Sequence, residues 1–206
     1  MVYLMKPGSE RNGPLLEHMY RDRKRVFVDR LGWNVPTVGE FERDAFDAGD
    51  ARYLIVTDSD RRHLGSVRLL PTHRPHLLDT HFPMLCSGAI PRGLHIMEIS
   101  RLCFSPECRV KELRTVRDRL TTALVQFGLL SGITSYTLVT GMSILSGILA
   151  QGWRCRPLGM PARHASELLG ALQITIESET ISRLRAAGTY ANGELSVAPS
   201  PLAFAA

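Results

Sequence analysis

The chain has 206 residues, 44% of them hydrophobic, and a formal net charge of +5. This length supports one sizeable core and is too short for two domains of ordinary size. We therefore expect a single domain over residues 1–188 and a flexible tail, rich in Ala, Pro and Ser, over residues 189–206. No apolar run is long enough to cross a bilayer and the N-terminus lacks a signal-peptide pattern, so the sequence predicts a cytoplasmic protein outside the membrane.

The positive charge is compatible with nucleic acid, an acidic protein or a phosphorylated carrier as partner, and it does not choose among them. The cysteines occur at positions 86, 103, 108 and 155, without a CxxC pair or the spacing of a zinc site. We expect neither a structural disulfide nor a bound metal.

The first half of the chain predicts a helix followed by strands. Residues 14–31 have apolar positions close to helical spacing, and Gly32 supplies a stop. Residues 33–51 are rich in Gly, Pro and acidic residues and predict a long loop, which is unusual unless it is functional. Strand-like runs then occur at residues 52–58 and 63–72, where they predict a hairpin, and at residues 95–104 after an irregular segment.

The second half alternates helices with strands. Helices are predicted over residues 113–131, over 143–151, and from Ser178 as N-cap to a stop at Gly188, and strands over 135–140, 153–159 and 172–178. This order predicts a mixed sheet with helices on both faces. It is similar to the α/β architecture of acetyltransferase-like (GNAT-like) proteins, an α/β/α sandwich with a central mixed, bulged sheet. The analogy concerns the fold and does not by itself give a function.

The run HIMEISRLC, residues 95–103, places Glu98, Ser100 and Arg101 inside what otherwise reads as a buried strand. A buried charge without a partner is costly, so these residues predict a polar site. Strict alternation would point Glu98 and Arg101 to opposite faces. We predict a β-bulge that brings both to one side, because bulges are frequent beside active sites. A structural ion pair at the strand end is the alternative.

Further charged residues lie in apolar contexts, namely Arg23, Asp44, Asp47 and Arg68. Arginines facing carboxylates in one cleft would neutralise each other and could hold a small zwitterion. Taken singly, each residue is compatible with an ordinary solvated surface charge.

A larger set of residues in chain order resembles the LuxI-type acyl-homoserine-lactone synthases, which make quorum-sensing autoinducers. The resemblance runs from about residue 15 to 188 and rests on Arg23, Val26, Phe27, Leu31, Trp33, Glu42, Asp44, Asp47, Arg68, Phe82, Glu98, Ser100 and Arg101. It implies transfer of an acyl chain from acyl carrier protein, or in some members from acyl-CoA, to the amine of S-adenosyl-L-methionine (SAM). Lactonisation and release of methylthioadenosine follow. SAM is then a co-substrate, and no cofactor is expected.

The resemblance also implies roles for these residues. The expected catalytic residues are Glu98 as general base, Ser100 and Arg101. The expected SAM site consists of Arg23, Asp44, Asp47 and Arg68, in an ion-pair network that also includes Arg101, and of Phe27, Trp33 and Phe82 as apolar walls. An aromatic face would attract the sulfonium, although ordinary core packing is the alternative for the three aromatic residues.

The second half of the chain offers side chains for an acyl pocket and for carrier docking. The candidate pocket residues are Met97, Leu102, Phe104, Leu124, Thr140, Met142, Leu145 and Ile148. Thr140 could bond a 3-oxo group, with the backbone as its alternative partner. The stretch CRVKELRTVRD lacks the glycine turn with which acetyltransferases hold CoA, which favours an acidic carrier protein over CoA. The candidate docking cations are Arg109, Lys111, Arg114, Arg117 and Arg154, with a solvated basic helix face as the alternative.

Two other functions compete with this one. A generic CoA-dependent N-acyltransferase is disfavoured by the missing glycine turn. A nucleic-acid-binding module is suggested by the positive charge alone, and we expect no nucleic-acid partner because the sequence has no recognition-helix signature.

Overall fold

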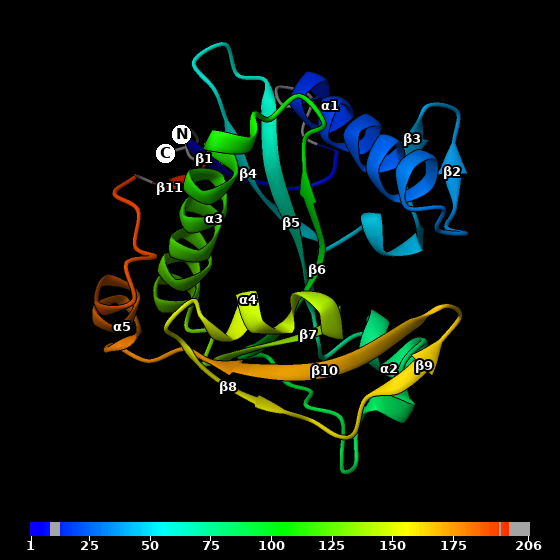
Figure 1. Cartoon of the computed structure of the whole chain (residues 1–206), viewed down its shortest axis with the longest axis vertical. Helices are drawn as coiled ribbons and strands as arrows, with labels where there is room; N and C mark the ends of the chain where they lie inside the picture. The colour runs from blue at the N-terminus through cyan, green and yellow to red at the C-terminus, as the bar shows by residue number, and fades with distance from the viewer. Residues whose placement is uncertain (9–12, 194, 198–206) are drawn as a thin grey trace, which may run out of the picture.

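The structure is a computed structural model that describes residues 1–8, 13–193 and 195–197. Its main strands are β1 (Val2–Met5), β4 (Arg52–Thr57), β5 (His63–Pro71), β6 (Ile96–Phe104), β7 (Ser135–Gly141), β8 (Arg154–Pro157), β9 (Ala162–His164), β10 (Glu167–Thr175) and β11 (Leu195–Val197). Within the described residues they form one sheet in the order β11-β1-β4-β5-β6-β7-β10-β8, with β9 beside β10 (Figure 1). The pairs β6–β7 and β1–β11 are parallel and the others antiparallel. The predicted mixed sheet is confirmed.

Helices lie on both faces of this sheet, as the sequence predicted. They are α1 (Gly13–Arg23), α2 (Leu77–Thr80), α3 (Val110–Ser131), α4 (Leu145–Leu149) and α5 (Thr180–Ala186). Side chains of β4 alternate between the two layers: Tyr53 and Ile55 pack in a cluster with α1, and Leu54 and Val56 pack in a cluster with α3. Because successive strand residues point to opposite faces, each central strand contributes to two cores.

The two long predicted helices are present. The helix expected over residues 14–31 is α1, which continues as a π-helix over Lys24–Arg30 and ends at Gly32 with φ +68°. The helix expected over 113–131 is α3, which begins three residues earlier and ends at Gly132 with φ +67°. Both helices are terminated by a residue in the left-handed conformation, which glycine adopts at little cost.

Most other predicted elements are also present, with shifted boundaries. The predicted hairpin is β4 and β5, and the charged strand is β6. The helix expected over 143–151 is a 3₁₀ turn at Met142–Ile144 followed by α4. The strand expected over 172–178 is β10, which begins earlier, at Glu167. The N-cap of α5 is Glu179 and not the predicted Ser178, a one-residue difference that is common at helix ends.

Several short elements were not predicted. The expected loop over residues 33–51 contains β2 (Thr37–Val38), β3 (Phe41–Glu42) and a 3₁₀ turn at Ala45–Asp47. The irregular segment before β6 contains α2 and a 3₁₀ turn at Pro83–Leu85, and β1 and β9 are also additional. Elements of two to four residues are too short to show a hydrophobic period, so sequence patterns do not reveal them.

Part of the expected tail is packed against the domain. The Thr189 side chain is buried, and its hydroxyl donates to the backbone oxygen of Gln151 at 2.5 Å. Further along, β11 pairs in parallel with β1. The boundary expected at residue 188 is therefore not the end of the packed chain. Residues 194 and 198–206 of the predicted tail lie outside the described residues.

Within the described ranges, no helix combines the length and apolar character that crossing a bilayer requires. Over the same ranges, no group of three or more His, Cys, Asp or Glu side chains is placed to hold a metal ion. The four cysteines are free thiols, of which Cys103 and Cys108 are buried.

Candidate active site

A bulge interrupts β6 at the charged residues. Ser66 of β5 is opposite Cys103, but Arg68 is opposite Ser100, so Arg101 and Leu102 together face one residue of β5. Arg101 adopts φ +52°, a left-handed conformation that is uncommon for residues other than glycine and occurs at bulges and turns. The predicted bulge is confirmed. It lets Ser100 and Arg101 both reach the side of the sheet on which α1 lies.

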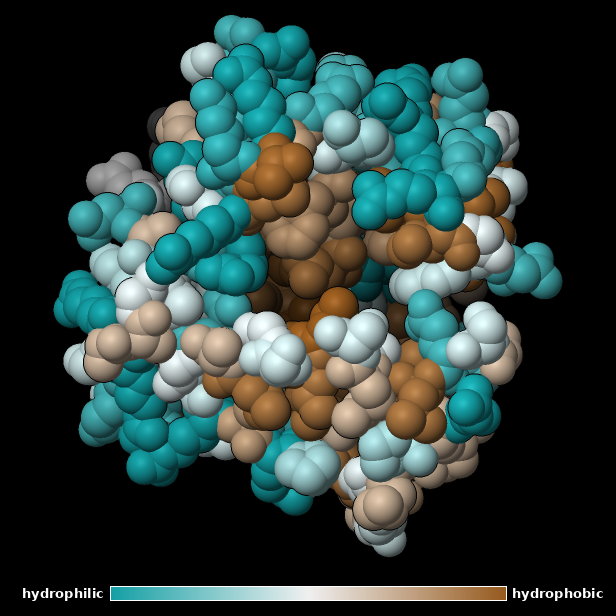
Figure 2. Space-filling model, viewed as in Figure 1, coloured by the Kyte–Doolittle hydropathy of each residue, from teal (hydrophilic) through white to brown (hydrophobic). Residues whose placement is uncertain are grey.

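Beyond the bulge, β6 and β7 separate. Their parallel pairing runs from Ile96 opposite Ser135 to Ile99 opposite Leu138, whereas β6 continues to Phe104 and β7 to Gly141. Figure 2 shows a hollow at the centre of the molecular surface seen in this view, with apolar side chains around it. It lies between the part of the molecule that carries β6 and α1 and the part that carries β7, β10 and α4 (Figure 1).

Arg23, at the end of α1, is the centre of the first half of a buried ion-pair cluster. Its guanidinium donates two hydrogen bonds to the two carboxylate oxygens of Asp47, each 2.8 Å long, and it also pairs with Glu42. All three side chains are buried. A capping interaction orients Asp47, because its Oδ2 accepts from the backbone N–H of Asp44 at 2.9 Å.

Two further arginines complete the cluster. Arg68 of β5 donates to both oxygens of Asp44, at 2.6 and 3.1 Å, and its Nη1 lies 2.9 Å from Asp47 Oδ1. Its Nε donates to Ser100 Oγ at 3.1 Å. Arg101 donates to Glu42 Oε1 at 2.9 Å and to Asp44 Oδ2 at 2.9 Å. The structure therefore brings together the charged residues that the sequence placed in one network.

The cluster is neutral in sum, because three arginines face Glu42, Asp44 and Asp47. Burial alone would raise the pKa of Asp47, but the hydrogen bonds and charge of Arg23 hold it well below its usual range. Tyr53 adds a hydroxyl donor to Asp47 at 2.8 Å. Tyr53 was missed by the sequence reading because it alternates like an ordinary core residue of β4.

Glu98 lies on the same strand face as Ser100 but outside this cluster. It is 1% exposed, and its two oxygens accept the backbone N–H groups of Leu77 and Leu78, at 2.9 and 2.7 Å, from the start of α2. Burial raises the pKa of Glu98 to about 7, although these two N–H groups act in the opposite direction. A carboxyl group with this pKa exchanges protons near neutral pH, as a general base must.

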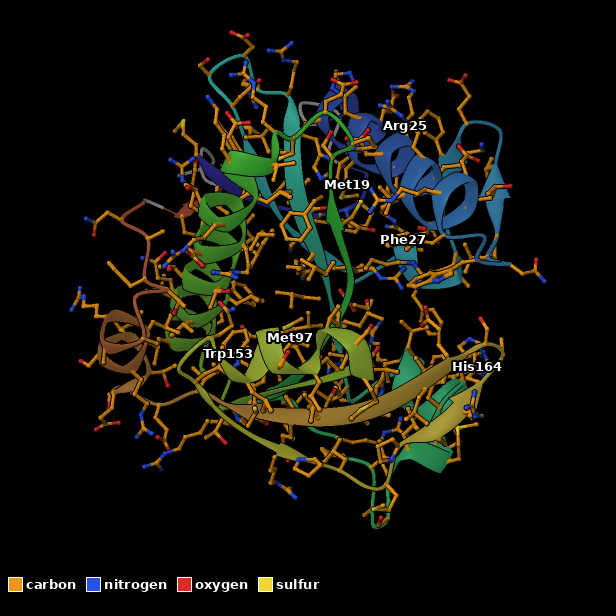
Figure 3. All side chains as sticks on the ribbon, in the orientation of Figure 1. Met19, Arg25, Phe27, Met97, Trp153 and His164 are labelled. Atoms are coloured by element: carbon orange, nitrogen blue, oxygen red, sulfur yellow. The ribbon has the colours of Figure 1, made fainter. Side chains whose placement is uncertain are left out.

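The aromatic residues predicted for the site separate into two groups. Phe27 and Trp33 stack with ring centroids 4.8 Å apart, and the Arg101 guanidinium lies 5.8 Å from the Phe27 centroid. Trp33 keeps 37% of its surface exposed. Phe82 packs instead in a cluster beneath α2, and its ring meets His164 of β9 edge-on at 5.2 Å. Figure 3 shows Phe27 and His164 on opposite parts of the molecule, above and below the hollow seen in Figure 2.

The predicted acyl-pocket residues also divide. Met97 and Leu124 are buried in the core under α3, and Phe104, Leu145 and Ile148 are half-buried against that core. Figure 3 shows Met97 and Trp153 near the centre of the molecule, beside α4. Trp153, which the sequence reading missed, belongs to the same cluster and donates to the Ile148 backbone oxygen at 2.9 Å.

Three further candidates lie outside that cluster. Leu102 is 41% exposed at the bulge, and Met142 is half-buried after β7. Thr140 is buried, and its hydroxyl lies 3.4 Å from the backbone oxygen of Gly141. A backbone partner was the alternative to a 3-oxo group that the sequence left open.

Four of the five predicted docking cations lie at the N-terminal part of α3, and the fifth, Arg154, lies on β8. Arg114 and Arg117 lie near Asp118 on α3, at 3.7 and 2.8 Å. Lys111 lines a cavity of about 490 Å³ on the side of α3 that faces β1 and the β4–β5 turn. Arg154 is on β8, where it lies 3.5 Å from Glu177. Arg109 is exposed at the N-cap of α3, and its backbone N–H donates to the Glu112 carboxylate at 3.1 Å.

Comparison with known proteins gives a consistent result over nearly the whole chain. Residues 8–184 match the family of autoinducer synthases. A probable acyl-homoserine-lactone synthase from Sinorhizobium fredii (strain NBRC 101917 / NGR234) is 29% identical over 192 residues, covering 91% of this chain and 92% of the relative. The acyl-homoserine-lactone synthase of Rhizobium etli is 30% identical over 179 residues, covering 85% of this chain and 84% of the relative.

Solved structures agree with these matches. The CoA-dependent acyl-homoserine lactone synthase BjaI, solved with SAM and isopentyl-CoA, is 25% identical with a TM-score of 0.87, and the match covers 98% of this chain and 95% of that one. A putative N-acetyltransferase from Lactobacillus plantarum, 16% identical with a TM-score of 0.59, shares the fold over 85% of this chain and 99% of its own. The predicted acetyltransferase-like architecture is thereby confirmed.

Proposed function

Since the chain belongs to the autoinducer synthase family and is an acyl-homoserine-lactone synthase, we propose that Glu98 is the base that activates its amine substrate. The enzyme transfers an acyl chain from acyl carrier protein or acyl-CoA to the amine of SAM. Lactonisation then releases methylthioadenosine. The family match decides against the generic N-acyltransferase and the nucleic-acid-binding module that the sequence left open.

The position and protonation of Glu98 carry this assignment. Its carboxylate is buried and fixed by two backbone N–H groups at the point where β6 and β7 begin to separate. Two lone pairs remain on its oxygens, and one can accept a proton from the SAM amine, directly or through a water. With a pKa of about 7, the group is ionised in about half of the molecules at neutral pH.

We place acyl transfer in this hollow, which is called the opening below and lies where β6 and β7 separate. The free amine attacks the thioester carbonyl carbon, and the carbon–sulfur bond of the donor breaks to release its thiol. Beyond Ile99 the backbone of β6 has no β7 neighbour, so N–H groups of this segment are available to the developing oxyanion. The carboxylate of the acylated product then attacks the carbon next to the sulfonium, which closes the lactone and expels methylthioadenosine.

The buried ion-pair cluster forms the SAM side of this site. Arg68 of β5 and Arg101 of β6 have their charges already paired with Asp44 and Glu42, so this side of the site is fixed before the substrate enters. The stacked rings of Phe27 and Trp33, next to Arg101, offer a partly exposed aromatic face to the sulfonium. Phe82 serves as a wall on the other side of the opening, from beneath α2.

The acyl chain lies against the apolar side chains between β6 and α4. Phe104, Leu145 and Ile148 provide half-buried surface in front of Met97 and Leu124. Leu102, exposed at the bulge, and Met142, half-buried after β7, are further candidates for contact with the chain. The Thr140 hydroxyl is available to a 3-oxo group only if it leaves the Gly141 backbone oxygen.

For the donor, acyl carrier protein is the proposal that the start of α3 supports. The Glu112 carboxylate occupies the N–H of Arg109 and adds a negative charge where a CoA pyrophosphate would otherwise be attracted. Similarity to the CoA-dependent BjaI favours acyl-CoA as the alternative. Both donors would be met in the cytoplasm, which we propose as the location. Comparing kcat/KM for one acyl group on carrier protein and on CoA decides between the donors.

The test of the base is Glu98→Gln in purified enzyme. We expect kcat/KM to fall at least 100-fold, because the amide cannot accept the proton, while SAM affinity measured by calorimetry changes little. Glu107→Gln is the matched control, since Glu107 is exposed and pairs with Arg25 on the surface. Turnover of Glu98→Gln within a few-fold of the wild type would reject the assignment.

A further inference from the structure

Two buried polar atoms close to Glu98 have no hydrogen-bond partner among the described residues. They are Nε2 of His76 and Oγ1 of Thr137, and both side chains are 0% exposed. Folded proteins rarely leave such atoms unpaired, and an internal water is their usual partner where protein groups are absent. The proposed function gives neither residue a role.

Both residues belong to the layer that encloses Glu98. Thr137 of β7 is in parallel register with Glu98 of β6, so the two side chains are neighbours on one face of the sheet. His76 directly precedes Leu77, whose N–H binds one Glu98 oxygen. The short helix that follows His76 covers this face, because Leu78 packs on Leu169 and Ala171 of β10. Thr137 therefore lies on the sheet face that α2 covers, and the fully buried His76 ring lies at the start of α2, against Arg74 and Asp79.

The donor and acceptor types in this layer match those that one bridging water can pair. His76 Nδ1 lies 2.9 Å from the backbone oxygen of Arg74 and 3.4 Å from Asp79 Oδ1, and because both oxygens are acceptors Nδ1 carries a proton. In the neutral imidazole Nε2 is then an acceptor. The Thr137 hydroxyl can donate, and each Glu98 oxygen has a free lone pair beyond its backbone N–H. A water that accepts from Thr137 and donates to both His76 Nε2 and Glu98 satisfies all three groups.

We propose that His76 and Thr137 hold an internal water against the enclosed side of Glu98 and thereby position the base and stabilise its carboxylate form. Both are positioning residues, since they act through Glu98 and touch no substrate. The inference rests on the proposed role of Glu98. It adds a hydrogen bond on the side of the carboxylate away from the SAM amine.

Other charged groups near Glu98 set the background for this effect. Arg68 of β5 lowers the pKa of Glu98, and Asp79 of α2 raises it. Asp79 is itself paired with Arg92 at 3.1 Å. Thr137 is an uncharged neighbour on β7, so replacing it removes a hydrogen bond without changing the charge of the site.

The test compares Thr137→Val with Thr137→Ser by the pH dependence of kcat/KM. Valine has nearly the shape of threonine but cannot donate, so the carboxylate loses its bridged hydrogen bond. The acidic limb of the profile should move to higher pH by about one unit, a roughly tenfold loss of kcat/KM on that limb. Serine should restore the wild-type limb. The KM for SAM at high pH should stay unchanged in both variants.

A structural role alone predicts a different result. Thr137→Val would then lower the melting temperature or kcat with its acidic limb at the wild-type pH, and this outcome would overturn the proposal. A crystal structure of the wild type adds an independent check. It should show a water within about 3.2 Å of Thr137 Oγ1, His76 Nε2 and a Glu98 oxygen, and well-defined density without it would also overturn the proposal.

The Glu98→Gln variant distinguishes failure of the proposed water from failure of the proposed general-base role of Glu98. If Glu98→Gln is inactive but Thr137→Val keeps the wild-type limb, Glu98 remains the base and the water is rejected. If Glu98→Gln is active, the general-base role of Glu98 is rejected, and the positioning role of the water is rejected with it.

Discussion

Replacing Asp47 with asparagine should destabilise the protein more than an ordinary surface change. The Asp47 carboxylate receives two hydrogen bonds from Arg23, one from the Tyr53 hydroxyl and one from the Asp44 backbone, and it lies 2.9 Å from Arg68. Asparagine has one acceptor oxygen and an amide group that would face the arginines. The buried Arg23 and Arg68 and the half-buried Arg101 would then share two carboxylates, which leaves one uncompensated positive charge at the edge of the core.

Removing one partner from a buried ion pair costs about 3–5 kcal/mol. Typical domains have an unfolding free energy of about 5–15 kcal/mol, so Asp47→Asn should remove a large share of the stability. Urea denaturation followed by tryptophan fluorescence and circular dichroism measures this difference. Asp50→Asn is the matched control, because Asp50 forms a surface pair with Arg74, and it should cost less than about 1 kcal/mol.

The effect should also depend on pH. The pKa of Asp47 is depressed in the folded state, so its contribution to stability is present above the unfolded pKa of about 4 and is lost as pH falls towards the folded pKa. The stabilities of wild type and Asp47→Asn should therefore converge as pH falls below about 4. A loss below about 1 kcal/mol at pH 7, or a difference that does not shrink in acid, would refute this view of the cluster.

Three further predictions concern activity. In the wild type, kcat/KM should fall about tenfold per pH unit below the Glu98 pKa of about 7, because the protonated acid cannot act as base; a flat profile from pH 5 to 8 would contradict this. Trp33→Ala should raise the KM for SAM about tenfold, whereas Trp33→Phe should retain most affinity, and equal effects in steady-state kinetics would argue against an aromatic contact. Reversal of both Arg114 and Arg117 to Glu should raise the KM for acyl carrier protein at least tenfold without changing SAM affinity, while Arg185→Glu on α5 should leave both constants unchanged; an unaltered carrier KM would reject this docking face.

The sequence predicted the charged part of the site well because buried charges require partners. Glu98, Ser100 and Arg101 stand out inside an apolar strand and predict a polar site, and the resemblance supplied the other members of the network. The bulge followed from the same reasoning, since strict alternation would have separated Glu98 from Arg101. The structure bears out both inferences through the Arg101 conformation and its bonds to Glu42.

The groups that hold Glu98 were beyond the reach of sequence patterns. The N–H groups of Leu77 and Leu78 come from backbone in a four-residue helix, which leaves no periodic signal. Side-chain identity likewise did not show that Phe82 would pack apart from Phe27, because both are simply large apolar residues. Contacts of this kind depend on how the strands separate in space.

Burial gives Glu98 the proton affinity of a base that works near neutral pH, and the proposed catalysis depends on this. Selective carbon-13 labelling of glutamate, with Glu98→Gln to assign the signal, allows the carboxyl group to be titrated by NMR in the protein without substrates. We expect a midpoint close to 7 for Glu98. A midpoint near 4, the usual value for an exposed glutamate, would contradict it.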